Sequence, residues 1–379
     1  MDFQLTEEQL EIQELARDFA EKKLAPTLVE RDENSQFSRE LFDEMGALGF
    51  MGICFEEKYG GLGLDYLSYI LALEEISKVD DGMGVAFSAS VSLCASPIAK
   101  FGTDEQKEKW LKGLVEGSKM GAFALTEPNA GTDAGSQETV AVKDGDSYII
   151  NGSKMFITNG YYAETYIIFA MTDPTKGIRG ITAFILDKDT EGFKFGKKEH
   201  KMGIRTSATY ELIFQDMRLP AENMLGKEGE GFKIAMWTLD GGRIGIAAQA
   251  LGISEAAFAH AKKYAKERKQ FGKPIAAQQA VSFMLADMYA KIEASRHLVY
   301  NAAWLKETGK PYGLAAATAK MYASDRAMEV TVDAVQVLGG YGYSEEYPVA
   351  RLMRNAKITQ IYEGTNQAQR MVIAGSILR

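Results

Sequence analysis

The first residue that could do chemistry is Glu363, a carboxylate that lies between an aromatic residue and a glycine in residues 361–366. A carboxylate can act as a general base when it is held next to a reacting proton. An isolated acid in this setting is more often an ordinary loop residue. The residues around Glu363 therefore allow a catalytic role but do not establish one.

Four other segments have compositions that suit ligand binding. Residues 123–133 form a polar loop with a glycine, and such loops offer backbone N–H groups to anions or cofactors. Phe156 is followed two residues later by Thr158, a pair that can cover a flat ring and hydrogen-bond its edge. Residues 239–245 contain paired glycines in a helical pattern. Each glycine destabilises a helix by roughly 1 kcal/mol relative to alanine, so their presence indicates the close approach of another group. Residues 267–274 are a charged helix end with a turn.

Several common chemistries find no support in the sequence. Gly229-Glu230-Gly231 lacks the third glycine of a dinucleotide-binding fingerprint, and no Walker A or G-x-S-x-G segment occurs. The three histidines are scattered, so no metal site is expected. A net charge of −9 argues against nucleic-acid binding, although a few local arginines can still hold an anionic ligand.

The first residues of the chain, the length of its apolar runs and its cysteines indicate the cellular setting. The chain begins with acidic and polar residues, and no secretory or organellar signal is visible. No apolar run reaches the roughly 20 residues needed to span a bilayer. Cys54 and Cys94 lie in apolar surroundings without C-x-x-C spacing, which predicts buried thiols rather than a disulfide. We expect a soluble cytoplasmic protein with no membrane contact.

The elements that must position the candidate residues change in character along the chain. Helical patterns dominate the first third, where Thr6 and Gln9 predict a capping box at the start of a helix. Short β-rich runs appear from about residue 120, and Asn151-Gly152 predicts a type I′ hairpin turn. Long amphipathic patterns return after Gly231 and continue to the end.

These last patterns predict four long helices. They cover residues 232–266, 279–308, 312–338 and 365–377, and a bundle is the natural packing for them. The chain is therefore expected to be mainly α with a central β domain. The expected domains are an N-terminal helical domain at 1–119, a middle β domain at 120–227 and a C-terminal four-helix bundle at 228–379.

Taken together and in order, the candidate segments resemble the acyl-CoA dehydrogenase family over the whole chain. Phe-Ala-Leu-Thr-Glu-Pro at 123–128, Arg268 with Phe271-Gly272, residues 336–340 and Tyr-Glu-Gly-Thr at 362–365 lie where that family has its flavin and catalytic motifs. The closest resemblance is to bacterial butyryl-CoA, or short-chain, dehydrogenases. It implies a β-barrel-like middle domain, with FAD bound between that domain and the bundle.

The resemblance also implies which residues meet the cofactor and the substrate. The expected FAD-binding residues are Phe123, Leu125, Thr126, Thr132, Phe156, Thr158, Arg268, Phe271, Gln279, Gln336, Val337, Gly339, Gly340, Thr365 and Gln367. The expected substrate-binding residues are Thr132, Phe232, Asp240, Arg243, Tyr362 and Gly364. Arg268, Phe271 and Gln279 would reach FAD in a neighbouring subunit, which implies a homotetramer built as a dimer of dimers.

The reaction implied by the resemblance begins at Glu363. This residue would remove the pro-R α-proton of an acyl-CoA while the β-hydride passes to flavin N5, giving a trans-2-enoyl-CoA. The backbone N–H of Glu363 and a ribityl hydroxyl of FAD would polarise the thioester carbonyl. Water exclusion by Tyr362 and the apolar channel would raise the pKa of the carboxylate toward the working pH. Electrons would be exchanged with an electron-transferring flavoprotein, and a fermenting bacterium could run the reaction in reverse.

Some relatives carry the base on a bundle helix instead. The matching position here is Gly242, which has no side chain, and this favours Glu363. Three alternatives stay open: a dehydrogenase for another chain length or a branched substrate, an acyl-CoA oxidase, and a non-catalytic flavin- or CoA-binding protein. The chain is shorter than typical oxidases, and the joint presence of Glu363 and Arg243 argues against a non-catalytic protein.

Overall fold

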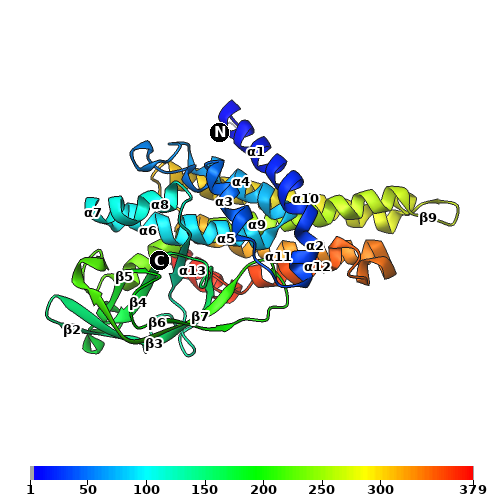
Figure 1. The fold of residues 1–379 in the computed structure, drawn as a ribbon. Coiled ribbons are helices and arrows are strands. Elements are labelled where there is room, and N and C mark those ends of the chain that lie inside the picture. Colours follow the sequence, from blue (N-terminus) through cyan, green and yellow to red (C-terminus); the bar gives the residue numbers. More distant parts are fainter. Residues whose placement is uncertain (1–3, 379) are drawn as a thin grey trace.

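The computed structural model describes residues 4–378, and its N-terminal part is helical (Figure 1). The helices of this part are α1 (Glu7–Phe19), α2 (Leu28–Glu33), α3 (Arg39–Ala47), α4 (Tyr66–Val79), α5 (Asp81–Ser88), α6 (Ser96–Phe101), α7 (Asp104–Gln106) and α8 (Lys112–Val115). The capping box predicted at Thr6 and Gln9 is confirmed, because each side chain accepts the other residue's backbone N–H. It begins α1 at Glu7.

A long apolar helical stretch runs through this part from Asp81 to Phe101. It comprises α5, a π-helical segment at Ala89–Ala95, and α6. Its length and mean hydropathy of 1.4 would suffice to cross a membrane, but 94% of its most apolar window is buried inside the protein. Burial of this kind is typical of a core helix in a folded domain. Cys94, which lies in it, is buried and unpaired, as the sequence predicted.

The middle of the chain forms one eight-stranded sheet. Its strands are β1 (Gly121–Ala124), β2 (Val140–Asp144), β3 (Ser147–Thr158), β4 (Thr165–Met171), β5 (Ile181–Asp187), β6 (Phe193–Lys198), β7 (Thr209–Pro220) and β8 (Met224–Leu225). The order is β6-β7-β3-β2-β4-β5-β8, and β1 pairs in parallel with β4. One side of the sheet packs its own apolar core, in which Tyr166, Phe184 and Phe214 are buried.

The hairpin turn predicted at Asn151-Gly152 is wrong. Asp144 pairs with Ser147, so the turn between β2 and β3 lies at Gly145 and Asp146, and β3 continues through Gly152. Gly152 instead lies at a register shift against β7. A Cβ at this position would come within 2.5 Å of Thr139 Oγ1, which explains the glycine by a close approach rather than by a turn.

Long helices form the C-terminal part and project beyond the other elements, with the short strand β9 at their far end (Figure 1). They are α9 (Gly231–Glu267), α10 (Gln279–Glu307), α11 (Gly313–Leu338), α12 (Pro348–Thr359) and α13 (Asn366–Ile377), and β9 (Lys269–Gln270) pairs with β10 (Lys273–Pro274). α9 contacts α4, α10, α11 and α12. Gly252 allows the approach of α4, since a Cβ there would lie 2.6 Å from the carbonyl oxygen of Glu74.

The sequence analysis missed α12. Pro348 occupies its first turn, where proline is well tolerated, but a proline after a glycine-rich segment reads as a break. α12 packs against both α9 and α11, whereas α13 packs against α11. The four predicted long helices are present, but α12 is a further member of the packed group.

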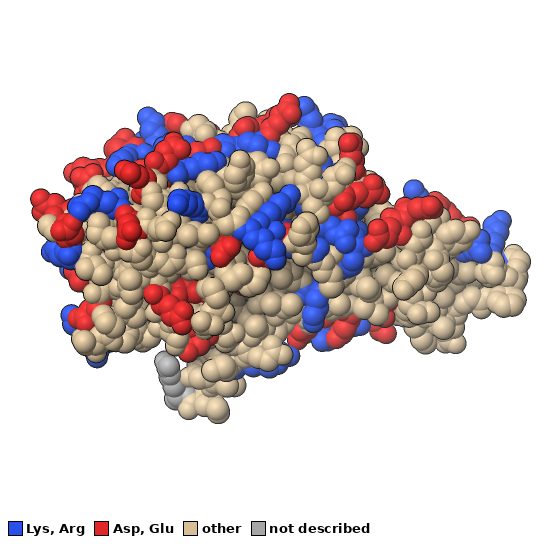
Figure 2. Space-filling model, turned by 60° about the horizontal axis from the view of Figure 1, so that its bottom comes forward, with Lys and Arg blue, Asp and Glu red and all other residues tan. Residues whose placement is uncertain are grey.

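Charged side chains of both signs are interspersed on the face shown in Figure 2. The projecting end of the long helices carries a large uncharged area in the same view. Among the exposed apolar residues of this end are Phe271, Phe283 and Tyr289. Apolar surface of this extent is typical of contact with another chain.

A buried ion pair ties the N-terminal helices to the start of α5, and it generates the first prediction. Arg31 Nη1 lies 2.6 Å from Asp80 Oδ2, and both side chains are almost fully buried. Asp80 also accepts from the hydroxyl of Thr206, in the connection before β7. Arg31→Met would leave the Asp80 carboxylate buried without its counterion, so we expect the free energy of unfolding to fall by about 3–5 kcal/mol. Urea unfolding followed by circular dichroism measures this loss.

The control is Lys22→Met, which removes an exposed ion pair with Asp18. Surface pairs contribute little, so this variant should unfold at the wild-type urea concentration. Equal midpoints for both variants would contradict the importance of the buried pair.

Candidate functional site

A cavity of about 330 Å³ lies where the sheet, the helical stretch from Asp81 and the C-terminal helices meet. Its wall brings together ten of the residues singled out in the sequence: Phe123, Leu125, Thr126, Thr132, Phe156, Thr158, Arg243, Tyr362, Glu363 and Gly364. They come from three parts of the chain that are far apart in sequence. The remaining wall is largely apolar.

Glu363 lies in the loop between α12 and α13, in a backbone conformation that is unusual for a residue with a side chain. Its φ is +50°, and Gly364 follows at +89°. Such a conformation costs about 1–3 kcal/mol and persists only where surrounding contacts impose it. Gln369, which is fully buried, donates to the carbonyl of Gly364 over 2.9 Å and to that of Glu363 over 3.3 Å. These contacts hold the loop in place.

Glu363 is partly buried, and the Oε2 atom of its carboxylate is fully buried and has no hydrogen-bond partner among the described residues. Burial raises the pKa of Glu363 to about 7, and the positive charges of Lys320 and Arg243 act against that rise. A carboxyl group with this pKa is a stronger base than a free glutamate, and it exchanges protons near neutral pH. Unpartnered buried carboxylates are costly, so this one indicates a functional requirement.

Gly242 in α9 leaves the space that this carboxylate occupies. A Cβ at Gly242 would lie 2.0 Å from Glu363 Oε2 and 2.7 Å from Leu93 Cδ2. The close approach predicted from the paired glycines is thereby confirmed, and the approaching group is Glu363. A side chain at position 242, where some relatives carry the base, would therefore occupy the same part of the cavity as the carboxylate of Glu363.

Arg243 lies one residue beyond Gly242 and is almost fully buried. Its Nη1 atom donates to Asp240, and its Nε atom has no partner among the described residues. Asp240 and Phe232 are partly buried on α9 but do not line the cavity. Tyr362 lines it and donates its hydroxyl to the side chain of Gln249.

A buried ion pair that the sequence analysis did not assign supports the loop 123–133. Lys154 on β3 is fully buried, and its Nζ atom lies 2.6 Å from Glu127 Oε1. The same ammonium donates to the carbonyl of Leu125 over 3.3 Å, and Glu127 accepts the backbone N–H of Glu138 over 2.6 Å. The available signal for this pair was a lysine directly before the apolar residues Met155, Phe156 and Ile157 of β3.

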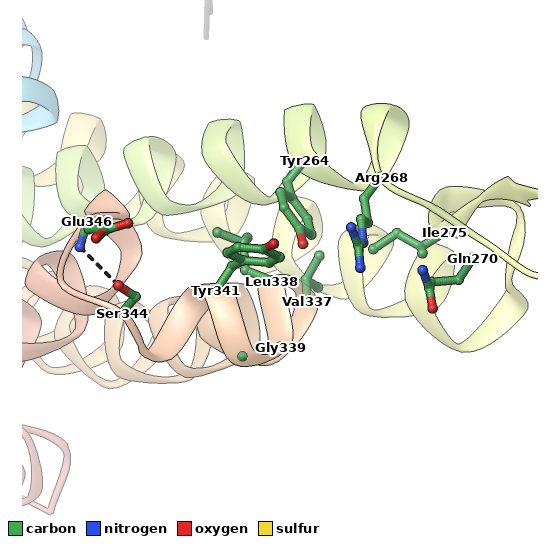
Figure 3. Close-up of a pocket in the computed structure, with 11 residues that line it drawn as sticks. Tyr264, Arg268, Gln270, Ile275, Val337, Leu338, Gly339, Tyr341, Ser344 and Glu346 are labelled. Atoms are coloured by element: carbon green, nitrogen blue, oxygen red, sulfur yellow. Dashed lines mark hydrogen bonds between the residues drawn. The ribbon is translucent and has the colours of Figure 1, made fainter.

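A second cavity of about 640 Å³ lies at the far end of the long helices (Figure 3). It is lined by Arg268, at the end of α9, and by Val337, Gly339 and Gly340, at the end of α11. Figure 3 shows Arg268 beside Tyr341, whose ring centre lies 5.7 Å from the guanidinium carbon. The predicted cofactor residues therefore divide into two groups within one chain.

The remaining predicted cofactor residues lie outside both cavities. Phe271 is 93% exposed, and Gln279 and Gln336 are also exposed near this end of the helices. Thr365 caps α13 by accepting the backbone N–H of Ala368, and Gln367 is exposed in the first turn. Thr365 and Gln367 follow Glu363 closely in the chain, whereas Phe271, Gln279 and Gln336 lie at the far end of the long helices. Within residues 4–378, no cluster of three or more histidine, cysteine or acidic residues could hold a metal ion.

Comparison with known families matches almost the whole chain. Residues 6–118, 122–217 and 229–378 match the family models described as the N-terminal, middle and C-terminal domains of acyl-CoA dehydrogenase. The chain belongs to the acyl-CoA dehydrogenase family. The predicted family and fold class are confirmed, and the protein is an oxidoreductase of this family.

Bacterial relatives are similar over their full length. The short-chain specific acyl-CoA dehydrogenase of Megasphaera elsdenii is 63% identical, and that of Clostridium acetobutylicum is 58% identical, with all of both chains covered in each case. The solved butyryl-CoA dehydrogenase of Megasphaera elsdenii superimposes with a TM-score of 0.99 over both full chains. A solved structure of the electron transferring flavoprotein of Acidaminococcus fermentans contains a chain that is 64% identical, also with a TM-score of 0.99 and full coverage of both chains.

The contact between Gly242 and Glu363 yields the second prediction. Gly242→Ala would push the Glu363 carboxylate from its place, so we expect acyl-CoA oxidation with an artificial electron acceptor to slow by about 10- to 100-fold. Gly241→Ala is the matched control, because its Cβ would come closest to the flexible end of Lys306, with the Tyr66 hydroxyl at 4.0 Å, and does not contact Glu363 within that distance. Similar losses in the two variants would show that the Glu363 contact is not responsible.

Proposed function

We propose that this protein catalyses the FAD-dependent α,β-dehydrogenation of short-chain acyl-CoA thioesters, such as butyryl-CoA to crotonyl-CoA, with Glu363 as the base. The observation that carries the proposal is the unpartnered Glu363 carboxylate, buried in a cavity that Phe156 and Thr158 also line. A base held without hydrogen bonds is free to accept a proton from a bound substrate. The family of the chain and the names of its relatives support the substrate class.

The residues of the first cavity fit a flat cofactor ring. Phe156 is 60% exposed at a φ of +59°, so its ring forms an open wall rather than part of the core. Thr126 and Thr158 place hydroxyl groups on the same cavity. Two solved relatives, 32% identical, are described as PigA with FAD. When bound here, FAD would supply the acceptor for the substrate's β-hydride.

The division of the predicted cofactor residues fits a site shared between subunits. Arg268, Gly339 and Gly340 line the second cavity, and we propose that they hold the ADP part of a cofactor bound mainly by a neighbouring chain. Exposed Phe271 and Phe283 at the same end are available for burial in such an assembly. A homotetramer meets this requirement. Subunits that contribute to each other's sites would make the oligomer necessary for cofactor binding.

The chain's own part in the reaction is to position the thioester and to move one proton. We propose that the thioester carbonyl accepts the backbone N–H of Glu363, which would increase the acidity of the α-carbon. The carboxylate of Glu363 then takes the α-proton. Tyr362, fixed by Gln249, helps to exclude water from this point.

The apolar wall supports a short acyl chain. Leu93 packs behind Gly242, and Met236 and Leu239 line the same cavity. The bacterial relatives are described as short-chain specific, which supports a short acyl chain at this wall. The Acidaminococcus fermentans relative supports exchange of electrons with an electron-transferring flavoprotein, in either direction of the reaction. A cytoplasmic location stays a prediction from the sequence.

The third prediction tests the base and the substrate together. Anaerobic titration of the FAD-loaded protein with acyl-CoAs from butyryl-CoA to octanoyl-CoA should bleach the flavin most readily with the shortest chains. Glu363→Gln should retain FAD but slow flavin reduction by about 100- to 10,000-fold, the contribution typical of a general base. Near-normal reduction in Glu363→Gln would exclude this residue as the base. A preference for octanoyl-CoA would exclude only the short-chain assignment.

The fourth prediction is a pH dependence. Because the base must be ionised and the pKa of Glu363 is about 7, the rate constant of flavin reduction should be low in acid. It should rise through about pH 7 and level off above it. Stopped-flow measurements at saturating butyryl-CoA check this profile. A rate that is half-maximal at the usual pKa of a free glutamate, and maximal well below pH 7, would contradict the effect of burial.

A further inference from the structure

Lys320 is a buried cation beside the loop that carries Glu363. It lies on α11, and its residue is fully buried. Its Nζ atom donates to the carbonyl of Gly364 over 2.7 Å and to the side-chain oxygen of Asn366 over 3.0 Å. Among the described residues it forms no ion pair with a carboxylate. A buried ammonium held only by neutral oxygens is costly, so its retention calls for an explanation.

The same face of α11 holds both ends of the loop. Asn366 exchanges hydrogen bonds with Ser324 and donates to Asp325 Oδ1 over 2.7 Å. Gln360 donates to the same Asp325 oxygen over 2.7 Å. Between Gln360 and Asn366, Lys320 donates its hydrogen bond to Gly364, the residue directly after Glu363. α11 therefore acts together with Gln369 of α13 to hold the loop in which Glu363 has its unusual backbone conformation.

Lys320 faces Glu363 as a cation up to about neutral pH, because burial lowers the pKa of its ammonium group to about 7 and the charge of Glu363 acts against that fall. Lys320 is the positive group that most strongly opposes the burial-raised pKa of Glu363, followed by Arg243 from α9. Arg243 is already paired with Asp240. Asp325 faces Lys320 from the next turn of α11 but is paired with Arg370. Tyr362, adjacent in the loop, is buried and keeps its proton at neutral pH, because burial raises its pKa well above its usual value.

We infer that Lys320 is a positioning residue for the catalytic base: it fixes the loop through the Gly364 carbonyl, and its positive charge favours the ionised form of Glu363. This inference rests on the proposed role of Glu363. Burial alone would leave the carboxyl protonated over most of the neutral range. The nearby cation keeps more of the group ionised, and therefore able to accept a proton, without occupying its Oε2 atom with a hydrogen bond.

The test is the pH profile of flavin reduction by butyryl-CoA in FAD-loaded variants. Lys320→Met removes both the positive charge and the hydrogen-bond donor. The acid limb of the profile, which is the pH range over which the rate rises, should therefore move to higher pH by about 1 unit. An adjacent opposite charge shifts a pKa by about that amount or more. At pH values below the limb, this shift corresponds to about a tenfold slower reduction. Lys320→Arg carries a positive charge at every pH of the profile, so its limb should not move to higher pH and should lie at or below the wild-type position.

Two further variants separate charge from support of the fold. Lys320→Gln can still donate a hydrogen bond but is neutral, so its limb should shift as in Lys320→Met. If Lys320→Met does not fold, the comparison of Lys320→Gln with Lys320→Arg decides the same question. Lys112→Met, which changes an exposed lysine paired with Glu116 on α8, should leave the profile unchanged.

The result that would overturn the inference is a wild-type acid limb in the neutral variants, whatever their maximal rate. A merely structural role would lower the rate at every pH without moving the limb. The failure of the proposed function is distinguishable: it would appear as normal reduction in Glu363→Gln. Loss of reduction in Glu363→Gln together with an unmoved limb in Lys320→Gln would reject only the role of Lys320.

Discussion

The burial of one carboxylate without a hydrogen-bond partner is the constraint on which the rest of the site depends. Glu363 must be kept out of water to be basic, yet a buried charge is expensive unless positive groups face it. Lys320 on α11 and Arg243 on α9 supply those groups from two directions. The loop itself is held in a backbone conformation with a φ of +50°, which the buried side chain of Gln369 helps to maintain.

The same constraint accounts for features of α9 that are otherwise unfavourable. Glycine inside a long helix weakens it, but Gly242 makes room for the carboxylate and Gly252 lets α4 approach closely. α9 can carry these residues because it packs against α4, α10, α11 and α12. Tertiary packing thus offsets a local weakness that serves the site.

The sheet and its loops form the other wall of the cavity at Glu363, and a buried ion pair holds this wall in place. The loop 123–133 is fixed by the fully buried pair of Lys154 and Glu127, so the residues it places on the cavity do not depend on a cofactor for their position. The second cavity lies elsewhere, at the far end of α9 and α11, where Arg268 is placed against the ring of Tyr341.

Much of this was determined by the sequence itself. Hydrophobic periodicity and capping residues predicted the helical, β and helical parts, because these signals are local in the chain. The ordered segments around Phe123, Phe156, Arg243 and Glu363 indicated the family, and the comparisons confirmed it. Local signals also failed where long-range contacts decided the outcome: Gly152 belongs to a strand opposite Thr139 rather than to a turn, and α12 begins with a proline that reads as a break.

Only the tertiary structure decided which groups surround Glu363, the proposed base. Gly242, Lys320 and Glu363 are separated by many residues, and no periodicity connects them. Their proximity follows from how α9, α11 and the loop before α13 pack. The raised pKa of Glu363 is likewise a property of that packing, since it arises from burial and from charges on other elements. Residue type determined that Glu363 can be a base, and the fold decided that it is buried, unpartnered and faced by two cations.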